Sequence, residues 1–448
     1  MADCKAGIEQ LLSYPLFDAM FRRRSRRVSK GIEQVLAGSL TYTSTQKPQP
    51  LSALEEAILI TATGVTGLTM PDQPFKTEAG KDLVGTPMLE ITGRSASSPD
   101  NAQATHFFMI NDSGTYLLKT PVDRAPPKLT PDKLDTEALI AFAEASKVKI
   151  LDHRLDFPRQ FPYYFGRNRY VSNTPGSTIF VPVVDMTRQY INQFMYLLCQ
   201  DDGYRPVFID DWNFYRLAGV KKWVKNGFLN KNFKIPLGMA NTFRIHVEAD
   251  LLVQNLLLVM QAMGLGGWVH AAFAGPYLLG SPQFPETSGA GLAFRHLTPK
   301  KFLRKLLIPI TPIPAWQPNP VGIDGLLEGY CPPYYPDMRA AVDALLRHKY
   351  GPDGVYHNQA AFDQIFQPGL GERFLKEVPH YTPETIECCK DICSYIWEAY
   401  GRFPAHVDAM YVPGIWVQSH HTDLDYYDQW FQNGYSETQA QHEGHWHG

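Results

Sequence analysis

A long apolar helix in the middle of the chain constrains the fold more than any other segment. Residues 248–263 carry apolar side chains on nearly every side, and the segment ends at Gly264-Leu-Gly-Gly267, a natural stop for a helix. A helix that is apolar nearly all round has to lie inside the protein. Three amide side chains interrupt its apolar run, which falls short of the roughly 18 residues of a membrane span. We therefore expect a buried central helix and no membrane partner.

The composition is that of a globular protein with little net charge. The chain has 448 residues, 44% of them hydrophobic, which is enough for two or three domains and a large core. The 42 basic and 45 acidic residues leave a formal charge of −3, which disfavours nucleic acid as a partner. The N-terminus lacks the basic-then-apolar pattern of a signal peptide, and the six cysteines form no disulfide framework or zinc spacing. We expect a cytoplasmic protein.

Local signals predict most of the remaining elements. Ser52 and Glu55 have the spacing of a capping box, which predicts a helix starting at Ser52. Residues 439–448 are polar and are predicted to be frayed. Caps, turn residues and apolar periodicity predict helices at 8–36, 131–148, 186–199, 338–348 and 383–400, strands at 179–184 and 322–330, and a hairpin with strands at 106–110 and 115–118.

Three motifs follow one another along the chain, and their order is as informative as their sequences. Arg23-Arg-Ser-Arg-Arg27 comes first, the helix 248–263 then runs into Gly264-Leu-Gly-Gly-Trp268, and a short apolar strand ends in Gly329-Tyr-Cys-Pro332. This order resembles the nitroreductase superfamily of FMN-dependent oxidoreductases. The resemblance implies an α+β fold in which helices flank a central, mainly antiparallel sheet. It covers residues 1–340, with insertions near 120–175 and 205–247. Residues 341–448 would form a helix- and aromatic-rich C-terminal extension docked on the core.

The resemblance also implies a cofactor site. Arg23, Ser25 and Arg27 match the motif that meets the flavin phosphate, Gly266 and Gly267 match the turn beside the isoalloxazine, and a loose alignment makes Arg339 a further phosphate-binding residue. These residue types suit a phosphate, because an arginine side chain binds it with two hydrogen bonds and a serine hydroxyl adds another donor. Glycines let the backbone approach a flat ring closely.

The same resemblance implies how the protein would act. It would be an FMN-dependent oxidoreductase that transfers hydride or electrons to or from a small organic substrate, with NAD(P)H as a possible electron donor. Members of the superfamily usually form homodimers. The hydride chemistry belongs to the cofactor, so no acid–base residue need stand out, and no catalytic residue is assigned.

Two alternatives belong to other classes of function. The chain can keep the fold without the flavin and act as a scaffold or interaction protein. It can also be a metal-dependent oxygenase, because His421-x-Asp423 is the first half of a 2-His-1-carboxylate triad. The second histidine would then be one of four candidates, His406, His442, His445 and His447. Short motifs of this kind occur often by chance, and a structural histidine pair is their commoner explanation.

Overall fold

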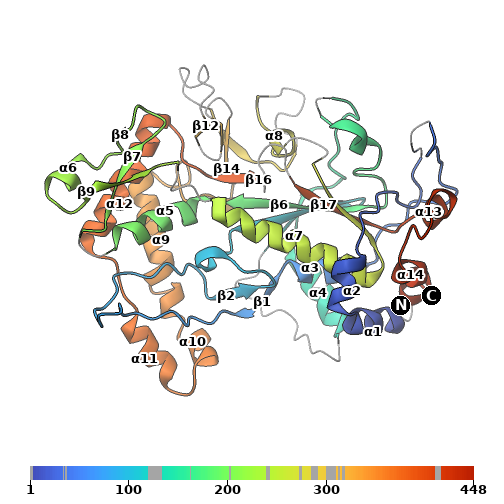
Figure 1. Ribbon diagram of the computed structural model, residues 1–448, viewed down its shortest axis with the longest axis horizontal. Coiled ribbons are helices and arrows are strands. Elements are labelled where there is room, and N and C mark those ends of the chain that lie inside the picture. The colour runs from blue at the N-terminus through green and yellow to red at the C-terminus, as the bar shows by residue number, and fades with distance from the viewer. Residues whose placement is uncertain are drawn as a thin grey trace.

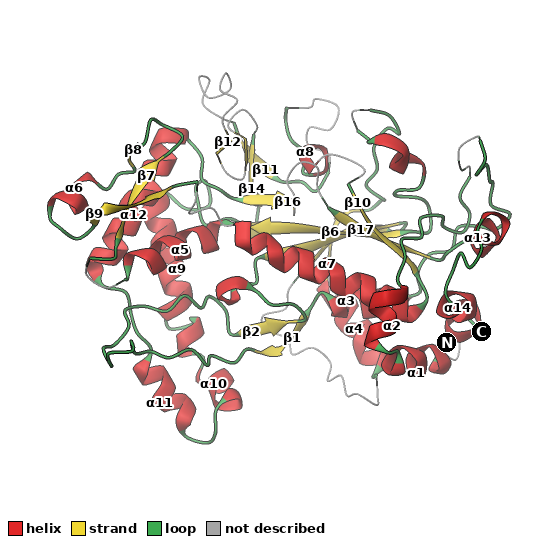
Figure 2. Ribbon diagram, viewed as in Figure 1, coloured by secondary structure: helices red, strands yellow, loops and turns green. Residues whose placement is uncertain are grey.

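In the computed structural model a seven-stranded sheet crosses the centre of the protein (Figures 1 and 2). Its strands run in the order β10-β17-β6-β3-β4-β5, with β16 also paired to β6, and every pairing is antiparallel. The structure describes residues 4–448 except 34, 36–37, 120–133, 162, 201–202, 239–242, 272–274, 284–290, 299–308, 311–312, 315–317 and 409–414. The seven strands are β3 (Thr105–Asn111), β4 (Gly114–Leu118), β5 (Lys147–Leu151), β6 (Thr178–Asp185), β10 (Gly266–His270), β16 (His406–Asp408) and β17 (Trp416–His420).

Side chains of the central strands alternate between two buried faces. On β3, Phe107 and Met109 join one apolar cluster, whereas Phe108 and Ile110 join another. The period of two in a strand produces this split. The first cluster includes buried residues of α3 (Ala53–Ala62), α4 (Thr136–Ser146) and α7 (Phe243–Met263), and α7 lies across the sheet as the expected buried helix (Figure 1). The second includes residues of the segment 155–164 and of α8 (Gly275–Leu278).

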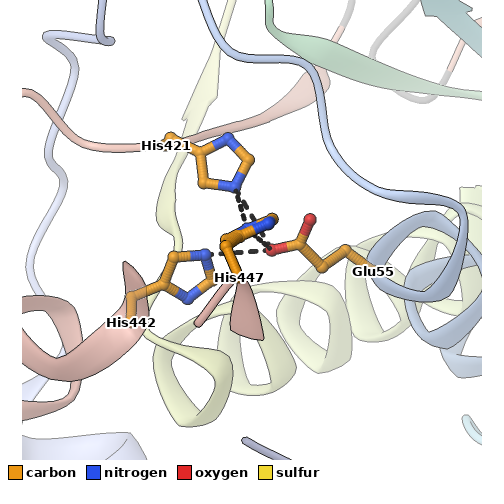
Figure 3. Close-up of side chains that lie close together, drawn as sticks. All are labelled: Glu55, His421, His442 and His447. Carbon is orange, nitrogen blue, oxygen red and sulfur yellow. Dashed lines mark hydrogen bonds and ion pairs between the residues drawn. The ribbon is translucent and has the colours of Figure 1, made fainter. Parts of the chain in front are cut away.

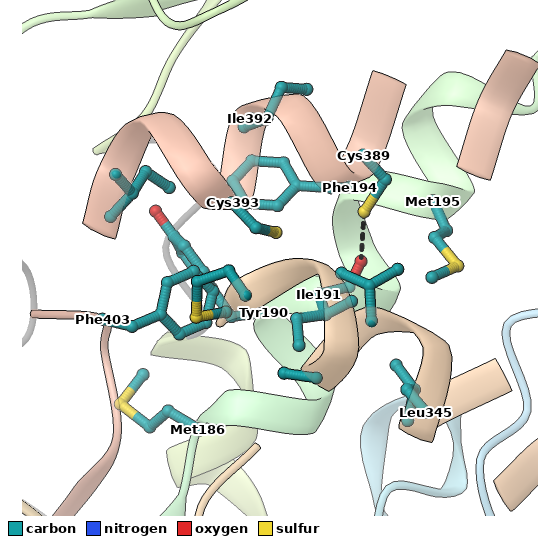
Figure 4. Close-up of a cluster of buried hydrophobic side chains, with 14 of the residues drawn as sticks. Met186, Tyr190, Ile191, Phe194, Met195, Leu345, Cys389, Ile392, Cys393 and Phe403 are labelled. Carbon is teal, nitrogen blue, oxygen red and sulfur yellow. Dashed lines mark hydrogen bonds between the residues drawn. The ribbon is translucent and has the colours of Figure 1, made fainter. Parts of the chain in front are cut away.

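A second helical layer lies beyond one end of the sheet. Here α5 (Thr187–Leu198), α9 (Met338–Tyr350) and α12 (Pro383–Tyr400) surround a large buried cluster (Figure 4). Around it lie β7 (Pro206–Asp210), β8 (Arg216–Leu217), β9 (Asn230–Pro236) and α6 (Lys221–Lys225), whereas α10 (Gln359–Ile365) and α11 (Leu370–Glu377) pack in a separate apolar cluster. The short strand pairs are β1 (Val65–Leu68) with β2 (Thr92–Arg94), β12 (Pro309–Ile310) with β13 (Ile313–Pro314), and β14 (Asn319–Ile323) with β11 (Arg295–Leu297) and β15 (Leu327–Glu328).

The two ends of the chain meet on the other side of the molecule (Figure 1). The helices there are α1 (Lys5–Ser13), α2 (Leu16–Arg22), α13 (Leu424–Trp430) and α14 (Glu437–Trp446). Trp446 is 1% exposed, and a Cβ atom on Gly7 would lie 2.5 Å from its ring. Ser436 and Gln439 form a capping box at the start of α14. The prediction of a frayed tail over 439–448 is therefore wrong.

The coarse fold prediction is confirmed, since the protein is α+β with a mainly antiparallel central sheet. The capping box at Ser52 and the helix at 383–400 are also confirmed. The predicted helix 8–36 is wrong beyond Arg22, because α1 and α2 are short and residues 23–33 form no helix. The predicted strand 322–330 is divided between β14 and β15. Thr130 and Pro131, at the predicted start of helix 131–148, lie outside the described residues.

The C-terminal extension does more than dock on the core. It supplies β16 and β17, and β17 lies between β10 and β6 in the sheet. Strands from both sides of the predicted boundary at residue 340 therefore belong to one sheet. Among the described helices, none combines the length and the hydropathy needed to cross a membrane.

Candidate functional site

The arginine motif follows α2 directly and belongs to no helix or strand. Backbone N–H groups of Arg27 and Val28 donate to the hydroxyl of Tyr427 at 2.8 and 3.3 Å. Arg26 is buried, and its Nε donates to the carbonyl of Gly434 at 2.7 Å. Burial raises the pKa of Tyr427, which keeps its hydroxyl protonated at neutral pH. The C-terminal part of the chain thus holds the motif in place.

An open pocket of about 940 Å³ lies against this segment. Its walls combine cationic and aromatic side chains, a composition that suits an anionic ligand with a flat ring. Ser25 and Arg27, two of the predicted phosphate-binding residues, line it, whereas Arg23 is not among the lining residues. The cationic and aromatic lining residues are Arg24, Arg26, Arg27, Arg167, Tyr170, Tyr426, Tyr427 and Phe431.

The predicted glycines lie close to the arginine motif but do not form an open surface. Both belong to β10, whose Trp268 has the guanidinium of Arg27 5.3 Å from its ring centroid. A Cβ atom on Gly266 would lie 2.6 Å from Nε2 of His420, and one on Gly267 would lie 2.6 Å from the sulfur of Met260. Neighbouring side chains therefore fill the space that the glycines leave. A larger residue at either position would collide with the core whether or not a cofactor is bound.

Arg339 does not join the other predicted cofactor residues. It lies on α9, where it pairs with Glu387 and, at 3.2 Å, with Asp391 of α12. These ion pairs link two helices of the second helical layer, and Arg339 is not among the residues that line the arginine pocket. The loose alignment that made it a phosphate ligand is therefore not supported by its position.

The predicted pair of His421 and Asp423 is also divided. The carboxylate of Asp423 accepts hydrogen bonds from the hydroxyls of Tyr42, at 2.9 Å, and of Ser44. Among the proposed second histidines, His406 lies on β16 and Nδ1 of His445 contacts the side-chain oxygen of Gln10 at 2.8 Å. Asp423 therefore has a structural role in which two hydroxyl groups satisfy its oxygens.

His421 instead meets His442, His447 and Glu55 (Figure 3). Oε1 of Glu55 lies 3.2 Å from Nε2 of His421, 2.9 Å from Nε2 of His442 and 3.3 Å from Nε2 of His447. Nε2 of His421 and Nε2 of His447 are 3.1 Å apart. Four atoms that could each bind a metal ion thus lie close together. They come from α3, from the residue after β17, from α14 and from the C-cap of α14.

The electrostatics of this cluster follow from its burial. Glu55 and His421 are at most 1% exposed, and the side chain of His447 is 19% exposed. Burial raises the pKa of Glu55, but the three imidazoles around its Oε1 outweigh this effect and hold the pKa well below its usual range. The hydrogen bond to Glu55 raises the pKa of His447. The carboxylate is therefore ionised inside the protein.

Sequence reasoning identified the three histidines as candidates but missed Glu55. The spacing of Ser52 and Glu55 was explained by the helix cap alone. The cap uses only one oxygen of Glu55, because Oε2 accepts the N–H of Ser52 at 2.6 Å. The other oxygen remains available for the histidines. A glutamate in the first turn of a mostly apolar helix was the one signal that could have identified it.

Comparisons with known proteins add no assignment to this geometry. No family model and no curated protein matches the chain.

Proposed function

We propose that the protein is an FMN-dependent oxidoreductase whose flavin binds in the arginine-lined pocket. The observation that carries this proposal is the contact between Arg27 and Trp268. It brings the arginine motif beside the Gly264–Trp268 turn, although about 240 residues separate them in sequence. The order of these motifs suggested the flavin, and their proximity in space supports it.

The donor set of the pocket fits a phosphate. Arg24, Ser25 and Arg27 place two guanidinium groups and a hydroxyl on one short segment, and Nη1 of Arg24 also donates to the carbonyls of Phe21 and Arg23. Charge-assisted donors of this kind bind a phosphate dianion. The ring would pack against the tyrosine and phenylalanine side chains of the pocket rather than against Gly266 and Gly267, where side chains occupy the space. Bound FMN would supply the hydride and electron transfer, with NAD(P)H as the proposed donor and a small organic molecule as the substrate.

Replacing Arg27 by alanine is expected to weaken FMN binding by roughly ten- to hundred-fold, the cost of one charge-assisted phosphate contact. The measurement is titration of the purified protein with FMN, followed by flavin fluorescence and by the visible spectrum. Arg22→Ala is the matched control, because Arg22 is exposed on α2 and pairs with Asp18 at 3.3 Å.

Two results would count against the flavin. Equal losses in Arg22→Ala and Arg27→Ala would indicate a non-specific basic patch. A wild-type protein that is colourless and ignores added FMN would favour the flavin-free scaffold.

A homodimer is part of the same proposal, and the exposed face of α2 supports it. Phe17 and Phe21 are 72% and 66% exposed and stack on each other, with Leu16 and Met20 exposed beside them. Apolar patches of this kind are typical of interfaces. The double substitution Phe17→Asp and Phe21→Asp is therefore expected to convert a dimer to a monomer in light scattering. A wild-type monomer, or a variant that stays dimeric, would contradict this assignment of the face.

A further inference from the structure

We propose that Glu55, His421, His442 and His447 bind a divalent transition-metal ion, with Zn²⁺ as the ion that their donor set favours. The four residues are called the His₃Glu cluster below. The inference stands on contacts within this cluster and does not depend on the flavin proposal.

The tautomers of two histidines leave lone pairs pointing at the carboxylate. Nδ1 of His421 lies 2.8 Å from the backbone carbonyl of Gln49, and Nδ1 of His442 lies 2.8 Å from that of Met263. A carbonyl oxygen only accepts, so each Nδ1 carries a hydrogen and donates it. In the neutral imidazole Nε2 is then an acceptor that faces Oε1 of Glu55. Acceptors that converge on an anionic oxygen repel it unless a proton or a metal cation lies between them.

The same arrangement orients histidines in metal sites. A ligating imidazole usually donates its second ring N–H to a carbonyl or carboxylate, which fixes the ring and its tautomer. Gln49 and Met263 supply such carbonyls. The N–H of Ser52 occupies the second oxygen of Glu55, so a single oxygen faces the histidines. Three of the four ligands therefore have their orientation fixed by groups outside the cluster.

The separations between donor atoms match those around one ion. Zn²⁺ binds imidazole nitrogen and carboxylate oxygen at about 2.0–2.1 Å, and a tetrahedron of that radius has edges of about 3.3 Å. Four of the six distances between the ligand atoms of the His₃Glu cluster are 2.9, 3.1, 3.2 and 3.3 Å, and all six are within 4.8 Å. Nitrogen and oxygen donors in this ratio suit Zn²⁺. The ion would also balance the buried carboxylate, whose ion-pair partners among the described residues are these imidazoles.

Four protein ligands leave no coordination position for a substrate, which is the pattern of a structural zinc site. The ion would tie α14 to the start of α3 and to the end of β17. It would also hold the residues that follow the arginine motif in place. Lys30 N–H donates to the carbonyl of His421 at 2.9 Å, and Asp423 N–H donates to that of Val28 at 3.1 Å. A metal site at the chain terminus thus supports one wall of the arginine-lined pocket.

The test is the metal content of the full-length protein. Elemental mass spectrometry of protein purified without added metal is expected to find roughly one transition-metal ion per chain. Zinc is expected to be the main metal. Protein treated with a chelator is expected to take up one Zn²⁺ and to melt at a higher temperature as a result. Replacement by Co²⁺ is expected to give the strong visible bands of a four-coordinate site. These measurements on the wild type need no variant to fold.

Variants then assign the ligands. His442→Ala and His447→Ala are each expected to weaken Zn²⁺ binding by more than roughly 10- to 100-fold, the usual effect of losing a group that only orients a metal ligand. His445→Ala is the matched control, because this residue lies on the same helix but contacts Gln10 instead of the cluster. A wild type that takes up no Zn²⁺, or uptake that is equal in His442→Ala, His447→Ala and wild type, would overturn the proposal. Uptake lost only in His445→Ala would also overturn it.

Discussion

Deleting residues 439–448 is expected to lower the free energy of unfolding by at least about 3 kcal/mol, the lower end of the usual cost of removing one large, fully buried aromatic side chain. The deleted side chain is that of Trp446, which packs against α1 at Gly7 and is 1% exposed. His442 and His447 leave with it, so the His₃Glu cluster is lost as well. Chemical denaturation and soluble yield of the truncated chain measure the effect.

A smaller deletion and a point variant separate the causes. Removing Gly448 alone is expected to change the stability by less than about 0.5 kcal/mol, as for most surface changes. Trp446→Ala, measured with a chelator present, is expected to show most of the loss in the free energy of unfolding, because the buried ring stabilises the fold without the metal. A truncated protein that melts with the wild type would show that α14 is dispensable.

The structure explains why this helix was not predicted. The buried positions of α14 are Thr438, Gln439, His442 and Trp446, so its inner face is mostly polar. A period of apolar residues identifies a helix only when the buried face is apolar. Here the polar groups are satisfied by tertiary partners, such as the carbonyl of Met263 for His442. Those partners lie far away in sequence and leave no local signal.

The strand β17 was missed for a related reason. All five of its residues are buried, yet Gln418, Ser419 and His420 are polar, so the segment shows neither alternation nor a continuous apolar run. By contrast, the helix 383–400 was predicted with its correct bounds, because Thr382 and Gly401 cap it locally. Caps and turns are properties of a few adjacent residues, whereas the pairing of β17 with β6 and β10 is set by the rest of the fold.

The candidate site was predictable only in part. The histidines of the tail were recognised because three of them lie within six residues, but the choice among them depends on which ones the turn of α14 directs toward His421. Asp423 was the obvious carboxylate from its spacing, yet Tyr42 and Ser44 bind it. Glu55 precedes His421 by 366 residues, a separation that no short motif can report.

Replacing Glu248 by alanine is expected to cost about 3–5 kcal/mol of stability, because it leaves a buried arginine without its partner. Nη1 of Arg94 lies 2.9 Å from Oε1 of Glu248, and these side chains are 3% and 0% exposed. The same carboxylate accepts the N–H of Thr105 at 2.9 Å and the hydroxyl of Ser98 at 2.6 Å. It therefore joins the central helix α7 to β2, to β3 and to the loop between them.

Asp250→Ala is the matched control, since Asp250 is an exposed acidic residue two positions further along the same helix, and its loss is expected to change stability by less than about 0.5 kcal/mol. The double variant Arg94→Met with Glu248→Leu removes both charges and is expected to be more stable than Glu248→Ala alone, because an apolar pair leaves no unpaired charge inside the protein. Denaturation curves of the three variants measure these differences. Equal stability of Glu248→Ala and Asp250→Ala would contradict the account, since it would mean that Arg94 finds another partner or water once Glu248 is gone. The expected order instead makes this pair a condition for burying α7, because Glu248 carries a charge from this long central helix into the core and Arg94 balances it.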